Sequence, residues 1–571
     1  MKLISGNLIL LRARETYDKN FTARITDIKG AKLILKSKGL SKYDLRETRF
    51  DVKFMFSRKL FEMMHVAIDK AYKLKTPLIF PKTNDRVQSC RITRFFNPRV
   101  VENLEQRTAV ECIVSGTSGN APFLLLGPPG TGKTVTIVEA ILQLVAANKE
   151  NRILVCAHSN QAVDNVACVL QKYKKHFDEN SYKLFLRINS RSRNCVQKCL
   201  EKDSVNAPVS MMVIKDYNII LCTLCHAYSY ILDYITHVVI DEAAQANEPS
   251  CLIPASRMRS LRPLILAGDS KQLGPVVVSN ESKKFGLGLS MMERLKETFP
   301  FYDNKAENKY MVMLKNNYRS DPHIIDLPNN IFYGGHLRAM AVVDPLSRQN
   351  ILNQKEKCRA IVFHGVSSTE TKDGTSFYNK DEIRVVQSYI CKLVNTHNVK
   401  GEDIGIIATY KSQVTLIKKW VDLYQLRIDV ATVDAFQGQE KRVILISTVR
   451  GKGANSNASL GFVDDDKRFN VALTRAKAKA IVIGNPNSLS TCPVWNMYIQ
   501  KCQRLGTHYG HVAENPKSQT TDLMIEQLQI PNYQPDTIAN VNKRRPRNVL
   551  IDPSDEEDLE TMDPLPDPPA G

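Results

Sequence analysis

Two kinds of hydrophobic pattern follow one another along the chain. Over residues 6–53, short apolar runs such as 8–11 and 33–35 alternate with charged turns, which predicts a small antiparallel β unit. The apolar spacing over 59–74 predicts a helix that leads into the next region. Beyond Phe95, short and fully apolar runs are separated by amphipathic stretches of helix length, which is typical of parallel strands covered by helices on both faces.

These fully apolar runs form two sets. The first set is 123–126, 153–156, 219–222, 237–240 and 264–267, and the second is 360–363, 404–407, 443–447 and 480–483. We therefore predict an α/β protein with consecutive α/β domains at 91–299 and 300–505, after a β unit and its connecting helix at 1–90. Periodicity fades after Gly506 and the end is acidic and Pro-rich, so we predict that residues 506–571 are mostly disordered.

The charge of the chain is strongly basic outside this acidic end. Among 571 residues, 79 Lys plus Arg stand against 59 Asp plus Glu, and the formal net charge is +20. The segment 552–567 holds eight acids and no base, so the remainder is more basic still. This balance excludes an acidic solvating protein and favours a polyanionic partner, either nucleic acid or a membrane surface.

Cysteine usage and the N-terminus bear on the compartment. The chain has 13 cysteines, an odd and dilute number, and no signal-peptide pattern precedes them, so we expect a reducing compartment and no disulfide scaffold. No run approaches the roughly 18 apolar residues that cross a bilayer. We therefore expect a soluble intracellular protein without membrane insertion.

A glycine-rich sequence lies between the first apolar run and a helical pattern. It consists of Gly127, Pro128, Pro129, Gly130, Thr131, Gly132, Lys133 and Thr134. In this context the backbone N–H groups surround phosphate oxygens and the helix adds its positive end. Lys133 is expected to reach the β and γ phosphates, and the Thr134 hydroxyl is expected to bind Mg²⁺.

A pair of carboxylates supplies the second half of such a site. Asp241 and Glu242 directly follow the apolar run 237–240. Alone, two adjacent acids would equally suit a solvated turn. Together with the phosphate loop they predict hydrolysis of a nucleoside triphosphate, with Asp241 holding Mg²⁺ through water and Glu242 orienting and deprotonating the attacking water.

Four later clusters narrow the class of enzyme. They are LAGDSKQLGP at 266–275, NYRS at 317–320, VDAFQGQE at 433–440 and RFNVALTRAK at 468–477. In this order after a phosphate loop they resemble the superfamily 1 helicases, in particular the RNA helicases of nonsense-mediated decay and RNA silencing. The resemblance extends over about residues 90–490. FNP at 96–98, VSGTS at 114–118 and the segment 460–477 are most similar to the Armitage and Moloney-leukaemia-virus-resistance branch.

This resemblance implies a fold and an activity. It implies two tandem RecA-like domains with ATP between them, a small N-terminal β-barrel, and ATP-dependent 5′ to 3′ translocation on single-stranded RNA. It further implies remodelling of RNA–protein complexes in small-RNA-mediated silencing, a monomer, a cytoplasmic location that includes RNA granules, and RNA-silencing ribonucleoproteins as partners. Two alternatives stay open: a DNA or DNA/RNA helicase of the same superfamily, and an ATP-timed RNA-binding scaffold without processive unwinding.

The resemblance also assigns roles around the nucleotide. Arg319 and Arg475, both expected in the second domain, stand where the family places its arginine finger, which neutralises transition-state charge on the γ phosphate. Gln272 should sense the γ phosphate. The remaining nucleotide positions are Gly438 and Glu440 near the ribose, Gln106 at the adenine edge, and Tyr318 stacked on the base, where a buried core tyrosine is the alternative.

Five polar residues after strand ends match the family's RNA contacts. They are Ser159, Asn160, Thr223, Thr409 and Thr432. Contacts to phosphate and sugar carry no sequence information, and such hydroxyls also commonly cap helices. Thr409 departs from the family pattern because Tyr410, where the family has proline, follows it.

Four further features compete with this interpretation. Cys222, Cys225 and His226 have the spacing of a haem attachment, and Cys195 with Cys199 would complete a four-ligand zinc site. The basic run 543–547 suits a nuclear-import signal or a solvated tail, and Ser554 precedes three acids as in an acidic-directed phosphorylation site. Members of the branch carry an extra region before the helicase core, so we expect a shortened paralogue or a fragment.

Overall fold

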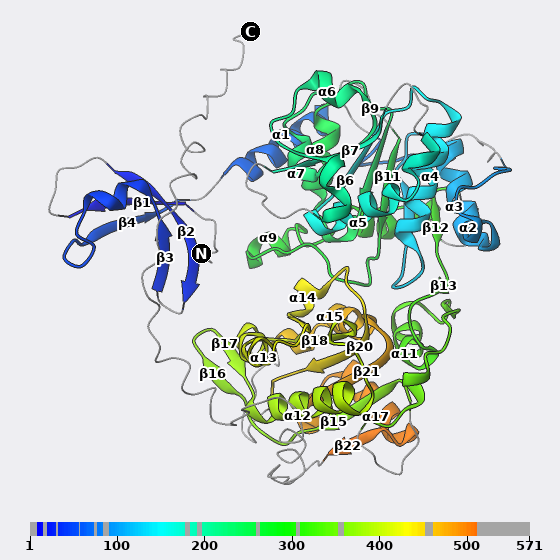
Figure 1. Cartoon of the computed structure of the whole chain (residues 1–571). Helices are drawn as coiled ribbons and strands as arrows, with labels where there is room; N and C mark the ends of the chain where they lie inside the picture. Colours follow the sequence, from blue (N-terminus) through cyan, green and yellow to red (C-terminus); the bar gives the residue numbers. More distant parts are fainter. Residues whose placement is uncertain are drawn as a thin grey trace. The chain divides into compact units, whose positions relative to one another are not determined.

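The computed structural model describes residues 8–14, 20–29, 32–55, 58–73, 77–83, 91–177, 183–190, 197–258, 263–303, 309–351, 359–451 and 461–510 (Figure 1). The acidic end, Lys543 to Arg547, Ser554 and Cys195 lie outside these residues. None of the described helices is long and apolar enough to span a membrane.

The N-terminal unit is an antiparallel sheet in the order β3-β2-β1-β4. Its strands are β1 Leu8–Ala13, β2 Phe21–Lys29, β3 Lys32–Lys36 and β4 Phe50–Phe54. Ile9, Leu11, Ala23 and Ile25 form its core. A pairing of β3 with β4, which would close a barrel, is not among the pairings of the described strands.

The first parallel sheet has the order β12-β5-β11-β10-β6-β9-β7-β8. Its strands are β5 Phe123–Leu126, β6 Ile153–Ala157, β7 Lys183–Asn189, β8 Ser204–Asn206, β9 Tyr217–Thr223, β10 His237–Asp241, β11 Leu264–Gly268 and β12 Met311–Met313. Its helices are α2 Pro98–Glu102, α3 Leu104–Ser115, α4 Lys133–Ala147, α5 Asn160–Gln171, α6 Met211–Lys215, α7 Leu224–Ala227, α8 Glu248–Ser256, α9 Asn280–Lys284 and α10 Met291–Thr298.

Both faces of this sheet are buried, which explains the unbroken apolar runs. Leu124 and Leu126 of β5 pack into a core with α8, α10 and the preceding helix α1 Lys59–Lys73. Phe123 and Leu125 point the other way, into a core with α3, α4 and α5. Lys70 of α1 also donates a hydrogen bond to the Ser256 carbonyl at the end of α8, 2.8 Å away. The predicted connecting helix therefore packs on the first sheet.

The second parallel sheet has the order β19-β18-β20-β21-β15-β22. Its strands are β15 Ile361–Gly365, β18 Ile404–Ala408, β19 Asp429–Ala431, β20 Lys441–Ser447, β21 Ala476–Gly484 and β22 His508–Gly510. Its helices are α11 Pro322–Phe332, α12 Lys380–Cys391, α13 Lys411–Leu423, α14 Val433–Phe436, α15 Asp466–Leu473, α16 Pro486–Leu489 and α17 Pro493–Leu505. Two minor pairs are β13 Asn316–Asn317 with β14 Arg338–Ala339, and β16 Thr371–Asp373 with β17 Ser376–Tyr378.

The two parallel sheets confirm the predicted mixed α/β class. Each sheet also includes a strand that lies beyond the boundary predicted for its domain. All nine predicted runs are strands. However, β12 belongs to the first sheet although it follows residue 299, and β22 belongs to the second although it follows residue 505. Each of these strands has only three residues, too few to show a period in the sequence.

Candidate functional site

The phosphate loop joins β5 to α4 near the middle of the first sheet. Gly127 N–H donates to the carbonyl of Gly268, at the end of the neighbouring strand β11, over 2.9 Å. Gly130 and Gly132 have φ of +70° and +82°, a region that favours glycine. A Cβ on Gly130 would also lie 2.5 Å from Cβ of Arg319. The loop conformation therefore requires glycine, and the N-terminal amides of α4 begin directly after it.

Lys133, Asp241 and Glu242 form a charge cluster beside this loop. The Lys133 Nζ lies 2.9 Å from Oδ1 of Asp241 and 2.6 Å from Oε1 of Glu242. Burial favours a neutral Lys133, but the two carboxylates outweigh it and hold its pKa above the usual value. Burial raises the pKa of Asp241, whereas for Glu242 the charge of Lys133 overcomes burial and lowers the pKa. Glu242 is thus an ionised carboxylate.

Gln245, a residue that the sequence motifs did not indicate, holds the other oxygen of Glu242. Its Nε2 donates to Oε2 of Glu242 over 2.8 Å. Glu242 itself has φ of +53° and precedes the short turn that carries Gln245. Both oxygens of Glu242 are therefore oriented, one by Lys133 and one by Gln245. The position of Gln245, three residues after Glu242, is the signal that could have identified it.

Gln272 and Arg475 meet across the two sheets. Arg475 follows α15, and its Nη2 donates to Oε1 of Gln272 over 3.1 Å. The Nε2 of Gln272 donates to Oδ2 of Asp269 over 2.7 Å. Burial, together with the nearby Arg319 charge, lowers the pKa of Arg475. The Arg475 charge in turn contributes to the low pKa of Glu242, so the second sheet brings a cation to the carboxylate cluster.

Arg319 lies a few residues after β12 of the first sheet and bonds to two residues that precede strands of the second sheet, Glu440 before β20 and Thr474 before β21. Its Nε is 2.5 Å from Oε2 of Glu440, and its Nη1 donates to the Thr474 carbonyl over 3.3 Å. Glu440 also pairs with Lys477 at 2.9 Å. Burial opposes ionisation of Glu440, but Arg319 and Lys477 lower its pKa. Asn317, which was not assigned a role, ties this segment to the loop by donating to the Pro129 carbonyl over 2.6 Å.

Gln106, Tyr318 and Gly438 border the same loop region. The buried Gln106 donates from Nε2 to the Thr131 carbonyl over 3.2 Å. Tyr318 is 47% exposed, which excludes the alternative of a buried core tyrosine. Its N–H donates to the Gly130 carbonyl over 2.8 Å, and its hydroxyl accepts from Nδ2 of Asn103 over 2.8 Å. Gly438 has φ of +80°, and a Cβ there would contact the Asn165 amide of α5 at 3.8 Å.

The five predicted nucleic-acid residues lie at the carboxyl edges of the two sheets. Ser159 and Asn160 follow β6. Thr223 is the last residue of β9, where it pairs with Ala157 of β6. Thr409 follows β18 and Thr432 follows β19, and these two strands are parallel neighbours. Each sheet therefore brings its own members together, as the parallel arrangement requires.

Their side chains differ in availability. The Ser159 hydroxyl accepts from Ala162 N–H at the start of α5, so it is a helix cap. Asn160 accepts from Nη2 of the buried Arg187 over 2.8 Å, and Thr409 donates to the Thr448 carbonyl over 2.8 Å. Thr223 and Thr432 occupy cap positions but make no side-chain capping bond.

The donor set at the loop fits Mg²⁺. The carboxylate of Asp241 ends β10, and the hydroxyl of Thr134 lies in the first turn of α4, so both are hard oxygen ligands of the kind that Mg²⁺ prefers. By contrast, the cysteines proposed for zinc contact other cysteines. Cys222 lies 4.0 Å from Cys156, and Cys199 lies 3.0 Å from Cys168. Among the described residues, no group of three or more His, Cys, Asp and Glu side chains could hold a metal.

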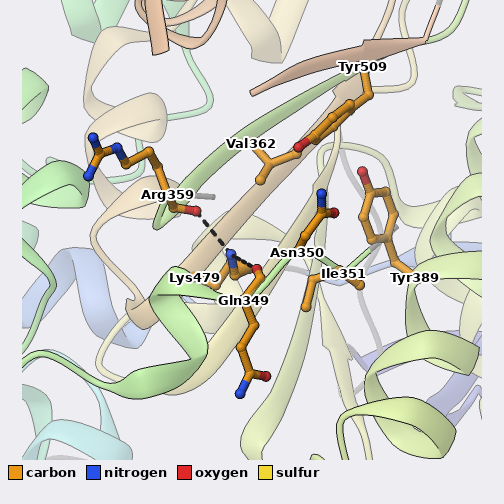
Figure 2. Close-up of a pocket in the computed structure, with 8 residues that line it drawn as sticks. All are labelled: Gln349, Asn350, Ile351, Arg359, Val362, Tyr389, Lys479 and Tyr509. Atoms are coloured by element: carbon orange, nitrogen blue, oxygen red, sulfur yellow. Dashed lines mark hydrogen bonds between the residues drawn. The ribbon is translucent and has the colours of Figure 1, made fainter. Parts of the chain in front are cut away.

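A separate pocket lies on the second sheet and contains none of the predicted site residues. It is lined by Gln349, Asn350, Ile351, Arg359, Val362, Tyr389, Lys479 and Tyr509 (Figure 2). The buried Lys479 donates to the carbonyls of Ser347, Gln349 and Arg359 over 3.3, 3.0 and 2.9 Å. These bonds connect β21 to the segments that flank the pocket and give Lys479 a structural role.

Comparison with known proteins matches both sheets. Two family profiles, each described as an AAA domain, match this chain: one matches residues 102–209 and 171–280, and the other matches residues 287–487. The protein mov-10-B.1 of Danio rerio is 33% identical over 573 residues, covering 92% of this chain and 56% of the relative. RNA helicase Mov10l1 of Homo sapiens is 36% identical over 461 residues, covering 75% and 37%. ATP-dependent helicase NAM7 of Saccharomyces cerevisiae is 33% identical over 416 residues, covering 65% and 41%. The chain thus spans about half of the length of the first relative and less of the other two.

Proposed function

The chain belongs to the UPF1-like family of superfamily 1 helicases, and from this premise we propose that it is an ATP-dependent RNA helicase. It would hydrolyse ATP to move 5′ to 3′ along single-stranded RNA and to remodel RNA–protein complexes. The observation that carries this proposal is the joint cluster of Lys133, Asp241 and Glu242 beside the phosphate loop, with Arg475 supplied from the second sheet.

Glu242 is the proposed general base. Its pKa is low, so it is ionised and able to accept a proton from the attacking water. Lys133 neutralises it in the present structure. Triphosphate oxygens would give Lys133 another anionic partner, which leaves Glu242 held by Gln245 and free to accept the proton.

Mg²⁺ would be held by Thr134 and Asp241. When bound, it neutralises charge on the β and γ phosphates. The remaining positive charge comes from this chain's own residues. Arg475 and Arg319 would act on the developing charge of the γ phosphate, since Arg475 bonds to Gln272 beside the first sheet and Arg319 lies next to Gly130 of the loop.

The position of these arginines ties hydrolysis to the relative movement of the sheets. Arg475 contacts Gln272 of the first sheet through a single hydrogen bond of 3.1 Å. Closure on ATP and opening after hydrolysis would therefore change the spacing between Thr223 on one sheet edge and Thr432 on the other. Gln106 and Tyr318 would contact the base, and Gly438 and Glu440 would lie near the ribose.

RNA would bind along the carboxyl edges of both sheets through backbone contacts. Thr223 and Thr432 are the strongest candidates, because their hydroxyls make no capping bond. Ser159, Asn160 and Thr409 would act mainly by shaping the edge, since each has a protein partner. We further propose a cytoplasmic monomer that acts on RNA-silencing ribonucleoproteins.

Site variants test the proposed hydrolysis. Glu242→Gln removes the base but keeps Lys133, so we expect ATP hydrolysis to fall about 10²- to 10⁴-fold while ATP binding persists. Lys133→Ala should lose both ATP hydrolysis and ATP binding. Glu281→Gln is the matched control, because Glu281 is exposed and, within the described part of the chain, its carboxylate forms an ion pair with the exposed Lys284 of the same helix alone. Substantial hydrolysis that survives both site changes would refute the assignment.

Substrate choice requires a second measurement. Stimulation of hydrolysis by single-stranded RNA should exceed that by single-stranded DNA of the same sequence, and the reverse order would favour a DNA helicase. Displacement of a strand from a 5′-tailed RNA duplex tests translocation. Hydrolysis without displacement would instead favour a scaffold whose ATP cycle times RNA release.

A further inference from the structure

A chain of hydrogen bonds runs between the two sheets through Tyr333, a residue outside every motif considered above. Tyr333 follows α11 and is only 5% exposed. Its hydroxyl donates to Oδ2 of Asp269 over 2.7 Å and accepts from Nδ2 of Asn470 over 2.8 Å. Asp269 and Asn470 are also buried. Tyr333 therefore joins the residue after β11 to helix α15.

The same Asp269 oxygen holds Gln272. Oδ2 of Asp269 accepts one hydrogen bond from Tyr333 and another, 2.7 Å long, from Nε2 of Gln272. With its Nε2 held in this way, Gln272 presents Oε1 to Nη2 of Arg475. The orientation of the Gln272 amide is thus set by Asp269, and the contact with Arg475 depends on that orientation.

Asn470 positions the helix that ends just before Arg475. Its Nδ2 donates to Tyr333 and also to the Lys271 carbonyl over 2.9 Å. Asn470 and Arg475 are five residues apart, on α15 and at its end. Asn470 therefore holds α15 to the segment that carries Gln272 in two ways, directly through the Lys271 carbonyl and indirectly through Tyr333 and Asp269.

We infer that Tyr333 is a positioning residue for the proposed ATP hydrolysis, because its hydroxyl holds Asp269 when Gln272 turns toward the γ phosphate. A buried carboxylate oxygen without a donor is costly. When Gln272 leaves, Tyr333 is the donor that remains on that oxygen, so it lowers the cost of releasing Gln272. Through its bond with Asn470, Tyr333 also holds α15 in place, so that Arg475 stays near the phosphates. This inference rests on the proposed function and deepens it.

The test is Tyr333→Phe, which removes one hydroxyl and keeps the ring. We expect the RNA-stimulated kcat to fall about tenfold with less than about a twofold change in the KM for ATP, as for a group that acts after binding. Tyr302→Phe is the matched control. Tyr302 is fully buried in the first domain and donates to the Pro122 carbonyl over 2.7 Å, away from Gln272. It should lower thermal stability similarly and leave kcat unchanged.

A double variant separates positioning from simple packing. The combined loss in Asp269→Asn with Tyr333→Phe should be smaller than the sum of the two single losses in free energy, because both changes remove the bond between Tyr333 and Asp269, while Tyr333→Phe also removes the bond to Asn470. Additive losses, or a Tyr333→Phe protein with wild-type kcat, would overturn the inference.

Amide exchange of the nucleotide-free protein keeps the inference testable if the proposed function fails. Peptides over 269–275 and 466–475 should exchange severalfold faster in Tyr333→Phe and at the wild-type rate in Tyr302→Phe. Unchanged exchange in both variants would refute the role of Tyr333. A wild-type protein that hydrolyses no ATP with or without RNA would refute the proposed function alone.

Discussion

At the scale of single residues, Gly132 shows how one backbone conformation shapes the phosphate loop. Its φ of +82° is rarely adopted by other residues, and a Cβ there would collide with the Gln106 amide. Gln106 in turn donates to the Thr131 carbonyl. The position of the Gln106 amide and the absence of a side chain at Gly132 therefore depend on each other.

We expect Gly132→Ala to weaken ATP binding by roughly tenfold or more, about 1.4 kcal/mol, because the positive φ strains any residue other than glycine and the Gln106 amide must move away from the loop. Fluorescent ADP titration would measure this. Gly116→Ala is the control. Gly116 also has a positive φ of +63°, at the end of α3, but its Cβ would meet nothing within 4 Å. It should cost about 1 kcal/mol of stability and leave nucleotide affinity unchanged. Equal losses of affinity in both variants would contradict this account.

At the scale of elements, α12 is attached to the end of β20 through a buried acid. Glu382 of α12 is fully buried, and its Oε2 accepts from the Ser447 hydroxyl over 2.6 Å and from Val449 N–H over 2.9 Å. Burial raises the pKa of Glu382 from 4.5 to about 8, despite these hydrogen bonds, and the nearby charge of Glu370 adds to the rise. Between pH 4.5 and about 8, Glu382 is therefore protonated in the folded protein and ionised in the unfolded chain.

Stability should consequently fall as pH rises from 4.5 to 8, by up to about 1.4 kcal/mol per pH unit from this group. The contribution is fully present below the unfolded pKa of 4.5 and is lost as pH rises through about 8. Glu382→Gln imitates the neutral acid, so it should match the wild type near pH 5 and exceed its melting temperature near pH 8.5. Thermal melts across pH would check this, and parallel curves for the two proteins would contradict it.

The strands also show which elements can be predicted from the sequence. All nine fully apolar runs became strands, because strands covered on both faces need apolar residues throughout. β7 was missed although it has seven residues. It contains Arg187, a fully buried charge whose Nε bonds to Oδ1 of Asp164 over 2.9 Å. Arg187 interrupts the apolar run of β7, and its partner Asp164 lies elsewhere in the sequence, so the local pattern did not predict this strand.

At the scale of the whole chain, the formal charge of +20 suits a partner that is itself a polyanion. If RNA is held mainly through its phosphates, log affinity should fall with log salt at a slope of about −0.7 for each contacted phosphate. Filter binding or anisotropy with single-stranded RNA at several salt concentrations would measure the slope. An oligomer with the same bases and an uncharged backbone is the control and should bind weakly. A salt-independent affinity for RNA would show that the charge only solvates the surface.

The sequence by itself determined the glycine-rich loop between β5 and α4, the two acids at the end of β10 and the presence of two parallel α/β halves, because each of these depends on residues that are close together in the chain. Only the tertiary structure decided the strand order, the short strands β12 and β22, and the contacts of Gln245, Asn317 and Tyr333. Gln272 and Arg475 are 203 residues apart and still share a hydrogen bond. Such pairs arise when two separately folded sheets pack together, and hydrophobic periodicity along the chain carries no information about that packing.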